Sequence, residues 1–555
     1  MSQDLHDFKS EEIEIHIRTY RSLLKASGSI KINQLIASHL SLKSILHQKG
    51  AGDDIDIAAF IYVLLRLPQI ISSVSEVILG QSYSVFKNAH LGAVTKWREV
   101  FAPGRRRKMF YDGKKRLAVY IASVTDVDDI ITLLTAFEIE WNKLHRKLSS
   151  IKNPGRYIET VLSPEDLGRL QNIYGKDFKT FLNSIKTKKV SFEVRLLAGS
   201  YVEYAKATSS WWKNILRTLH TLGVPHRPIY FVSSNTHSLT NILTRFALYE
   251  EKKLISYLYR LNNPELIRLW EQIQSGGFLA NREYFLYYIA KKYAAAYPEI
   301  LKKKEALERQ LGIHTVRSSR YLDIDAQVIE ISKLGTDKQL AGKLKTDLSP
   351  LQKSKAVILN IDYPLGWAAY QVLTEIGQNV DLIKGVYIMG KAATLTGQIG
   401  DILIPTTVYD QHTKNVYALN NTFSPKDFRD TFRTGRVLDG QKSVSTKGTF
   451  LENEKLIKQW FEAGYTIIEM EGGPYLNAVY EFIYYNRYTE NQFISLVNPP
   501  FELGLIHYAS DTPYSKAKNL GVRNLSYEGV EPTYAISRAI LSKIFTRELS
   551  SNPNL

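Results

Sequence analysis

Short apolar runs alternate with helix-like segments along the last part of the chain. Residues 356–361 form an apolar run with charged residues on either side, which is typical of a buried strand. A helix is predicted over 367–376 and a second strand over 385–389. The alternation continues to a predicted final helix over 533–545. This pattern predicts a largely parallel α/β sheet with helices packed against it.

The chain before this α/β part is predicted to be mainly helical. Apolar residues recur at helical spacing from Ile13 onward, and two short runs, 117–122 and 228–232, are strand candidates among the helices. The segment 125–129 carries three aspartates before an apolar-periodic run and is interpreted as a helix start. Ligation of a hard cation by these aspartates is the alternative, and we predict no metal site.

The length of the chain predicts more than one domain. A chain of 555 residues is too long for one ordinary core, so two or three domains are expected. The helical periodicity weakens between 312 and 350, where Ser, Asp, Lys and Gly accumulate. We therefore predict a mostly α-helical domain over 1–311, a joining segment over 312–350 and an α/β domain over 351–555.

The composition is that of a globular protein with an excess of basic residues. Hydrophobic residues make up 44% and charged residues 23%, and the formal net charge is +17. A positive field attracts nucleotides, nucleic acid or anionic lipid without choosing among them, and lysine-rich solvated helices can produce the same total. The segment 105–116 interleaves basic and aromatic residues, which predicts either a nucleic-acid contact or a solvated loop.

Cysteine usage and hydropathy bear on the compartment. The sequence contains no cysteine, which removes disulfides, thiolate metal sites and cysteine nucleophiles and fits a reducing compartment. The first residues are polar and lack the order of a signal peptide. The most apolar stretch, 57–65, is too short to span a bilayer. We expect a cytoplasmic protein with no membrane partner.

Five short motifs follow one another in and after the first strands of the α/β part. They are a strand and small-residue turn (385–395), a Gly-Asp turn (400–405), a polar segment (445–451), an acid before two glycines (467–473) and a Ser-Asp pair (508–511). In this order they resemble the purine nucleoside phosphorylase and methylthioadenosine/S-adenosylhomocysteine nucleosidase superfamily. The resemblance implies a mixed sheet flanked by helices and cleavage of the N-glycosidic bond of a purine nucleoside or nucleotide.

The resemblance also implies ten site residues of two kinds. The catalytic candidates are Asp511, Glu471 and Asp362. The substrate-binding candidates are Met470, Phe450, Leu451, Ser510, Gly390, Lys391 and Ala392.

The chemistry of bond cleavage supports two of these roles directly. An ionised Glu471 could accept hydrogen bonds from the ribose hydroxyls, and such bonds are about twice as strong as neutral ones. Asp511, if protonated or paired with a proton source, could protonate the leaving purine, an effect worth about 10²–10⁴-fold. Three of the candidates have a structural alternative: Glu471 as a helix cap, Asp511 as a turn residue and Phe450 as a core aromatic.

Two departures from the superfamily leave the reaction open between hydrolysis and phosphorolysis. The acid that activates water in the nucleosidases has only Asp362 as a counterpart. The Gly-Arg arrangement that phosphorylases use is missing after Gly366, and Lys391 is either a phosphate ligand or a surface lysine. We expect no cofactor, and inorganic phosphate would be a co-substrate only in phosphorolysis.

Two further functions remain as alternatives. The first is a non-catalytic nucleotide sensor in which the α/β part binds and the helical part transmits. The second is a nucleic-acid-binding protein that uses the basic segment 105–116. The expected partner is a small-molecule nucleoside or nucleotide, and a homo-oligomer in which a neighbour completes the pocket is consistent with the resemblance.

Overall fold

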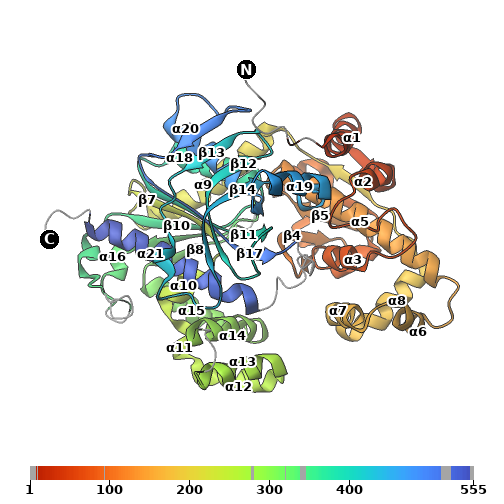
Figure 1. Ribbon diagram of the computed structural model, residues 1–555, viewed down its shortest axis with the longest axis horizontal. Helices are drawn as coiled ribbons and strands as arrows, with labels where there is room; N and C mark the ends of the chain where they lie inside the picture. The colour runs from red at the N-terminus through yellow and green to blue at the C-terminus, as the bar shows by residue number, and fades with distance from the viewer. Residues whose placement is uncertain are drawn as a thin grey trace.

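Two β-sheets organise the protein (Figure 1). The structure is a computed structural model, and it describes residues 8, 10–92, 94–276, 281–318, 321–337, 340, 346–513 and 527–550, without the side chains of Arg106 and Glu528. In the described chain one sheet has six strands and the other has eleven. The protein is therefore a mixed α/β structure, as the alternation in its C-terminal part predicts.

The six-stranded sheet lies wholly within the part that the sequence predicts to be mostly helical. Its strands, in order across the sheet, are β1 (Ser29–Lys31), β6 (Glu193–Leu196), β2 (Glu76–Gly80), β5 (Arg116–Tyr120), β4 (Arg105–Tyr111) and β3 (Arg98–Ala102). Of these only β5 is predicted. The others are missed because they are short, and because β4 begins with basic residues where the sequence pattern lacks an apolar run.

The helices of this N-terminal part pack beside the six-stranded sheet around a long buried helix, α5 (Val124–Leu148). Ser123 and Asp126 form a capping box at the start of α5, so the predicted helix start is confirmed. The remaining helices are α1 (Glu11–Ser27), α2 (Ile36–Ser41), α3 (Ile57–Leu64), α4 (Tyr83–Phe86), α6 (Pro154–Val161), α7 (Pro164–Tyr174) and α8 (Phe178–Thr187).

The eleven-stranded sheet forms the centre of the molecule. Its strands, in order, are β16 (Phe493–Leu496), β13 (Val416–Leu419), β12 (Ile402–Asp410), β14 (Val437–Ser445), β15 (Ile467–Glu469), β11 (Ile383–Thr394), β7 (Ile229–Ser234), β10 (Val357–Asp362), β9 (Ala326–Glu330) and β8 (Ile313–Val316), with β17 (Glu502–Asp511) paired to both β11 and β12. Strands β10, β7, β11 and β17 are parallel neighbours, so their carboxyl ends meet at one edge.

Helices cover both faces of the parallel strands. In β7, Ile229 and Phe231 pack on one face against α9 (Tyr201–Thr221), α18 (Ala368–Asn379) and α20 (Gly472–Ile483), whereas Tyr230 and Val232 pack on the other. Figure 1 shows α18 and α20 above these strands and α10 and α14 below. The helices beyond those already named are α10 (Ser238–Thr244), α11 (Phe246–Tyr249), α12 (Glu251–Leu261), α13 (Pro264–Gln274), α14 (Arg282–Ala296), α15 (Glu299–Gln310), α16 (Ile331–Leu334), α19 (Glu454–Glu462) and α21 (Val530–Ser550).

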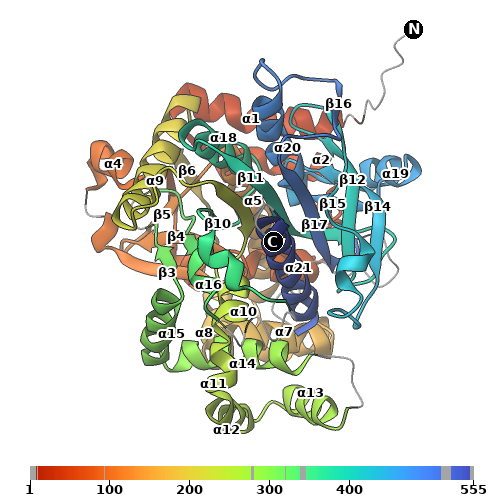
Figure 2. The same ribbon diagram turned by 90° about the vertical axis from the view of Figure 1, so that its left-hand side faces the viewer.

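Five strands of the larger sheet close into a ring. Strand β11 pairs with β15, β15 with β14, β14 with β12, β12 with β17, and β17 returns to β11. Figure 2 shows these strands next to one another. The ring encloses a small apolar cluster, to which each strand contributes one residue: Ala392, Leu403, Leu438, Ile467 and Ala509. Two of the five are alanines, and a narrow ring of five strands has room for only a few larger side chains beside them.

Strand pairing does not follow the predicted boundary between the two parts. Strand β7 belongs to the predicted helical domain but lies between β10 and β11, and β8 and β9 lie in the predicted joining segment 312–350. The apolar core beneath α5 also includes Phe450 and Trp460 from the predicted α/β domain. The predicted division at 312–350 is therefore wrong for the sheet, because loss of helical periodicity there marks two strands rather than a linker.

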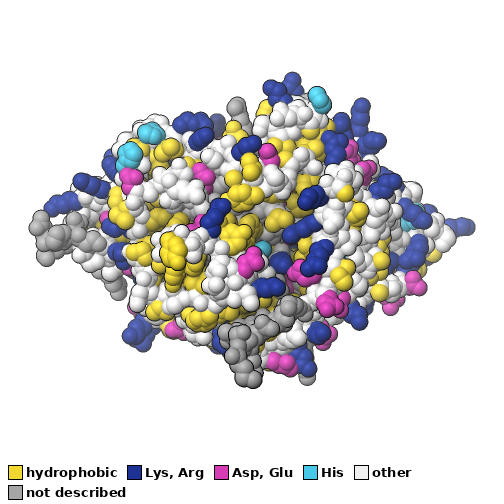
Figure 3. All heavy atoms as spheres, turned by 90° about the horizontal axis from the view of Figure 1, so that it is seen from above, with side chains coloured by type: hydrophobic (Ala, Val, Ile, Leu, Met, Phe, Trp, Pro, Cys, Tyr) yellow, Lys and Arg dark blue, Asp and Glu magenta, His cyan; other side chains and the backbone are white. Residues whose placement is uncertain are grey.

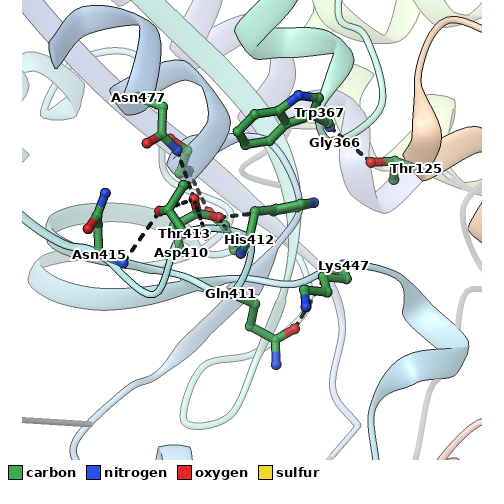
Figure 4. A network of polar contacts seen from close by, with 12 residues as sticks. Thr125, Gly366, Trp367, Asp410, Gln411, His412, Thr413, Asn415, Lys447 and Asn477 are labelled. Carbon is green, nitrogen blue, oxygen red and sulfur yellow. Dashed lines mark hydrogen bonds and ion pairs between the residues drawn. The ribbon is translucent and has the colours of Figure 1, made fainter. Parts of the chain in front are cut away.

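A buried polar network joins strand β12 to helix α20 (Figure 4). Asp410, fully buried, accepts hydrogen bonds from the Thr413 hydroxyl at 2.7 Å and the Asn477 amide at 2.8 Å. In the same view the backbone N–H of Trp367 donates to the Thr125 hydroxyl at 3.0 Å. This second contact ties the loop after β10 to the start of α5, which positions both elements at the cavity described next.

Candidate active site

A cavity of about 420 Å³ lies between the carboxyl ends of the parallel strands and the elements α3, β4 and α5 of the N-terminal part. Its volume lies within the range of small-molecule binding pockets. Seven of the ten predicted site residues line it. They are Asp362, Lys391, Ala392, Met470, Glu471, Ser510 and Asp511.

A β-bulge positions the Ser-Asp pair. Ala392 of β11 is paired with Ala509 of β17, but the next residue, Ala393, is paired with Asp511, so Ser510 is an extra residue. A bulge bends its strand and redirects the side chains beside it. The Ser510 hydroxyl donates to the Asp511 carboxylate at 2.7 Å. Asp511 therefore ends a strand and is not the turn residue of the structural alternative.

Glu471 points away from the helix that follows it. It is the N-cap residue of α20, but its side chain makes no capping hydrogen bond. The cap is supplied by Glu469, whose Oε2 accepts from the backbone N–H groups of Glu471 at 2.7 Å and Gly472 at 2.6 Å. The carboxylate of Glu471 instead accepts from the backbone N–H of Gly366 at 3.4 Å. The helix-cap alternative for Glu471 is therefore wrong.

Burial changes the protonation expected for Glu471. Its residue surface is 8% exposed, and burial, together with the negative charge of Glu469, raises the pKa of Glu471 to about 8. Burial likewise raises the pKa of Glu469 to about 7. At neutral pH Glu471 is thus mostly protonated, whereas the sequence-based role assumes an ionised carboxylate. A protonated carboxyl can donate one hydrogen bond to a sugar hydroxyl and accept another.

Glu452 is a buried acid of the cavity that the sequence analysis misses. Its carboxylate accepts a hydrogen bond from the Thr446 hydroxyl at 3.1 Å. Burial and, to a smaller extent, the charge of Asp511 raise the pKa of Glu452 to about 8. The sequence does contain a signal for this residue, because Glu452 directly follows Leu451 at the end of the third motif. Glu452 therefore holds a proton at neutral pH, and it lies close enough to Asp511 for the charge of Asp511 to affect its pKa.

The loop after β10 closes one side of the cavity. Residues 362–365 line it, and Gly366 follows with a φ of +54°. A Cβ atom on Gly366 would lie 2.5 Å from the Thr125 side chain of α5, so only glycine fits this approach. The close contact fixes where Asp362 and the Gly366 N–H stand relative to Glu471.

Three predicted site residues lie outside the cavity lining. Phe450 is 1% exposed and packs against the rings of His39, His47 and Tyr62, as its core alternative states. Leu451 is equally buried in the same core. Gly390 lies inside β11, where a Cβ would meet the His507 ring at 2.8 Å. These positions follow a motif in the chain, but the side chains of Phe450 and Leu451 belong to the packed core, and Gly390 is packed against the His507 ring.

The wall opposite the strand ends carries basic residues from the N-terminal part. Arg66, Arg105 and Arg107 line the cavity. Arg105 pairs with Asp129 of α5 at 2.5 Å, and Arg107 pairs with Asp126. Arg105 and Arg107 belong to the basic segment 105–116, but they lie in a strand and not in a solvated loop. They do not form an exposed basic surface either, because β4 directs them inward against α5. Lys108 pairs with Asp323 at 3.4 Å, and burial raises the pKa of Asp323 to about 6.

Basic side chains do not gather into a single patch on the face shown in Figure 3. On the face in Figure 3, Lys and Arg side chains are scattered among acidic, apolar and neutral ones.

The three aspartates of segment 125–129 each pair with an arginine, Asp128 with Arg21 at 2.6 Å. Within the described residues no group of three or more potential ligands is arranged to hold a metal ion. No helix of the described chain has the length and apolar character needed to cross a membrane.

Comparison with protein families gives one match along nearly the whole chain. Residues 32–546 match a family described as "Family of unknown function (DUF6909)". The chain belongs to this family. No curated protein matches it.

Among solved structures, nucleosidases and a phosphorylase are similar to part of the chain. The 5′-methylthioadenosine/S-adenosylhomocysteine nucleosidase from S. pneumoniae has a TM-score of 0.29 and 11% identity, covering 43% of this chain and 94% of that one. The S-adenosylhomocysteine nucleosidase from Streptococcus pyogenes has a TM-score of 0.28 and 12% identity over 43% and 91%. A methylthioadenosine phosphorylase from an antarctic soil metagenomic library has a TM-score of 0.26 and 9% identity over 35% and 73%. At values this low the likeness says nothing about the activity of this chain.

Proposed function

We propose that this protein cleaves the N-glycosidic bond of a purine nucleoside or nucleotide. The observation that carries the proposal is the convergence of Glu471, Asp511 and Glu452 on one cavity of ligand size. These acids are far apart in the sequence, and buried acids are rare unless they serve a ligand or are paired. The resemblance of the sequence motifs supports the same class of reaction.

The leaving base is the first requirement of the reaction. As the bond between the sugar and the purine breaks, its electron pair goes to the purine ring, which then needs a proton. Asp511 is the candidate to deliver that proton to a ring nitrogen, and Glu452, with a pKa of about 8, is the candidate proton source for Asp511. General acid catalysis of this kind is worth about 10²–10⁴-fold.

The sugar is the second requirement. Glu471 would hold the ribose hydroxyls, and Met470 beside it would pack on the sugar face. As positive charge develops on the sugar, the ionised form of the Glu471 carboxyl group would stabilise that charge. The sugar carbon then forms a bond to water or to phosphate, and Asp362 is the candidate to take the proton of an attacking water.

A non-catalytic sensor remains the second candidate, because both parts of the chain contribute to the cavity walls. Residues of α3, β4 and α5 face the same space as the strand ends, so a bound ligand would contact both. The two proposals differ in one respect: a sensor binds without turnover.

The test is release of free purine from a panel of nucleosides and nucleotides, with and without phosphate, followed by chromatography. The proposal expects base release by the wild-type protein and a loss of rate in Asp511→Asn and Glu471→Gln with the fold retained. Dependence on phosphate would assign phosphorolysis, and independence would assign hydrolysis. Tight binding of a panel member with no base released would favour the sensor and end the enzymatic proposal.

A further inference from the structure

A hairpin turn brings the arginines of the N-terminal part together. Strands β3 and β4 are joined by Pro103 and Gly104, since Ala102 is paired with Arg105. The backbone N–H of Gly104 donates to the Leu65 carbonyl at 2.6 Å, and a Cβ at Gly104 would lie 2.9 Å from the same oxygen. The turn therefore sits directly on the chain that leaves α3. This contact places Arg105 next to the segment that carries Arg66.

The charges in this cluster do not cancel. Arg105 and Arg107 are matched by Asp129 and Asp126, which leaves the cluster neutral before Arg66 is counted. Arg66 is only 9% exposed, and among the described residues no carboxylate pairs with it. A buried charge without a partner is costly, so an anion in the cavity would stabilise this arrangement.

Some hydrogen-bond donors of these arginines have no acceptor among the described residues. The side chain of Arg107 is 6% exposed, yet its Nη1 has no hydrogen-bond partner among the described residues. Arg66 uses Nη1 to donate to the Tyr62 carbonyl at 3.2 Å, and its guanidinium lies 3.5 Å from the centre of the Tyr62 ring. Stacking on the ring orients the guanidinium at the cavity wall. The planar fork of arginine suits the oxygens of a phosphate group.

The arginine cluster adjoins the sugar side of the proposed site. The Thr449 hydroxyl lies 3.9 Å from the sulfur of Met470 and belongs to the same cavity wall as Tyr62. The positive charge of Arg105 is also close enough to Glu471 to oppose the rise in its pKa that burial and Glu469 cause. A group attached to the sugar, on the side away from the purine, would therefore face the arginines.

We propose that Arg66, Arg105 and Arg107 form a phosphate-binding end of the cavity, so that the substrate class is a purine nucleoside bearing a phosphate, or a nucleoside bound together with free phosphate. This inference rests on the proposed function for the identity of the ligand's remainder. The phosphate oxygens accept hydrogen bonds from Arg66, the negative charge offsets that of Arg66, and Arg105 and Arg107 line the same end of the cavity.

Calorimetric titration tests the phosphate end. The protein with Asp511→Asn, which limits turnover, is titrated with the pairs adenosine and AMP, guanosine and GMP, inosine and IMP, and with inorganic phosphate alone. In at least one pair the monophosphate is expected to bind about tenfold or more tightly than the nucleoside, or phosphate itself to bind and strengthen nucleoside binding. Competition by inorganic phosphate against the monophosphate assigns the phosphate to the substrate, whereas strengthening of nucleoside binding assigns it to a co-substrate.

Variants of Arg66 test the residues. Arg66→Gln is expected to weaken binding of the phosphate-bearing ligand about 10–100-fold while changing nucleoside binding less than about twofold, and Arg66→Lys is expected to fall between. Arg98→Gln is the matched control, since Arg98 is exposed on β3 and lies over the Tyr111 ring at 5.6 Å, outside the cavity lining. Circular dichroism and thermal unfolding establish that each variant is folded.

The outcomes separate this inference from the proposed function. Equal affinity for nucleoside and monophosphate together with no effect of inorganic phosphate overturns the phosphate end, even if nucleosides are cleaved. Loss of both ligands to the same extent in a folded Arg66→Gln protein also overturns it. Arg66-dependent phosphate binding with no base released by the wild-type protein supports the phosphate end and ends the enzymatic proposal.

Discussion

The two walls of the cavity differ in the partners that they give to their buried acids. On the strand-end wall, Glu452 is 6% exposed and has a threonine hydroxyl as its hydrogen-bond donor. On the arginine wall, Asp126 is 5% exposed and pairs with Arg107. Burial is nearly the same, so the difference between the walls lies in the partner. An acid with only a neutral donor keeps its proton to higher pH, whereas an acid beside a guanidinium forms an ion pair.

In the proposed reaction, this difference assigns proton transfer to one wall and anion binding to the other. Acids that hold protons near neutral pH suit proton transfer, which supports the strand-end wall as the place where the bond breaks. Arginines with spare donors suit the binding of an anion. The predictions that follow alter one wall at a time.

The largest expected effect is on the rate of base release. Glu452→Gln removes the proton source of the strand-end wall and is expected to slow base release about 10²–10⁴-fold, because the purine would leave without a ready proton. The wild-type rate should also decline above pH 8, where Glu452 loses its proton, and this decline should be weaker in the variant, in which only Glu471 still titrates near pH 8. Rates are measured by chromatography across pH 5–9.

The control for that variant is Glu138→Gln. Glu138 is 2% exposed in α5, and burial raises its pKa to about 7, but it lies outside the cavity lining and accepts a backbone N–H at 3.0 Å. Base release by the control should stay within about twofold of wild type, since a buried acid away from the site takes no part in proton transfer. Unchanged rates in Glu452→Gln would remove that residue from the mechanism.

The arginine wall is expected to respond in stability. Arg107→Met leaves Asp126 buried without its cation, which should lower the free energy of unfolding by about 3–5 kcal/mol. Urea denaturation measures this loss. Adding Asp126→Asn should restore part of it, because the uncompensated charge is removed as well. Arg169→Met, which breaks an exposed ion pair with Glu165, is the control and should cost below about 1 kcal/mol. Equal losses in the two single variants would contradict the paired-wall description.

The pH dependence of stability tests the strand-end wall. Glu452, Glu469 and Glu471 have pKa values of about 8, 7 and 8 in the folded state against 4.5 in the unfolded chain. The folded state thus binds more protons between those values. The contribution of these three groups to stability is complete below pH 4.5 and is lost as pH rises through 8, at about 1.4 kcal/mol per pH unit for each group.

Unfolding by urea at pH 5, 6, 7 and 8 measures this dependence. Glu452→Gln should show a shallower decline than wild type, because one of the three proton-binding groups is gone. A decline of the same slope in both proteins would show that Glu452 does not retain its proton in the folded state.

The smallest expected effect is that of a substitution at Phe450, in the core next to the strand-end wall. Phe450→Leu should lower the free energy of unfolding by about 1 kcal/mol through poorer packing against the histidine rings. The preference among purines should change less than about twofold, since the ring does not line the cavity. A larger change in that preference would return Phe450 to the substrate-binding role that the resemblance implies.

Local patterns predicted much of the parallel sheet. The apolar runs at 356–361 and 385–389 are strands β10 and β11, and the run at 228–232 is β7, because a buried strand needs a short continuous apolar run whatever its neighbours are. The same reasoning missed β4. Its basic residues are stabilised by acids on α5, and this pairing joins residues that no local pattern connects.

Seven of the ten predicted site residues line the cavity. Their placement also follows from the strand pattern. Residues at the carboxyl ends of parallel strands gather at one edge, so Asp362, Lys391 and Asp511 could be placed together from the strand pattern. Phe450 and Gly390 could not be placed in this way. Whether a side chain faces the cavity or the core depends on the packing of its neighbours.

The sequence by itself determined the alternation of strands and helices and the acids at the strand ends, because both follow from short-range periodicity and from residue types. The tertiary structure alone decided that Arg105 and Arg107 of β4 line the same cavity as these acids. It also decided that a bulge at Ser510 places Asp511 at this cavity. Sheet register and the approach of Gly104 to Leu65 are long-range contacts. Their energies depend on surroundings that form only when the whole chain has folded.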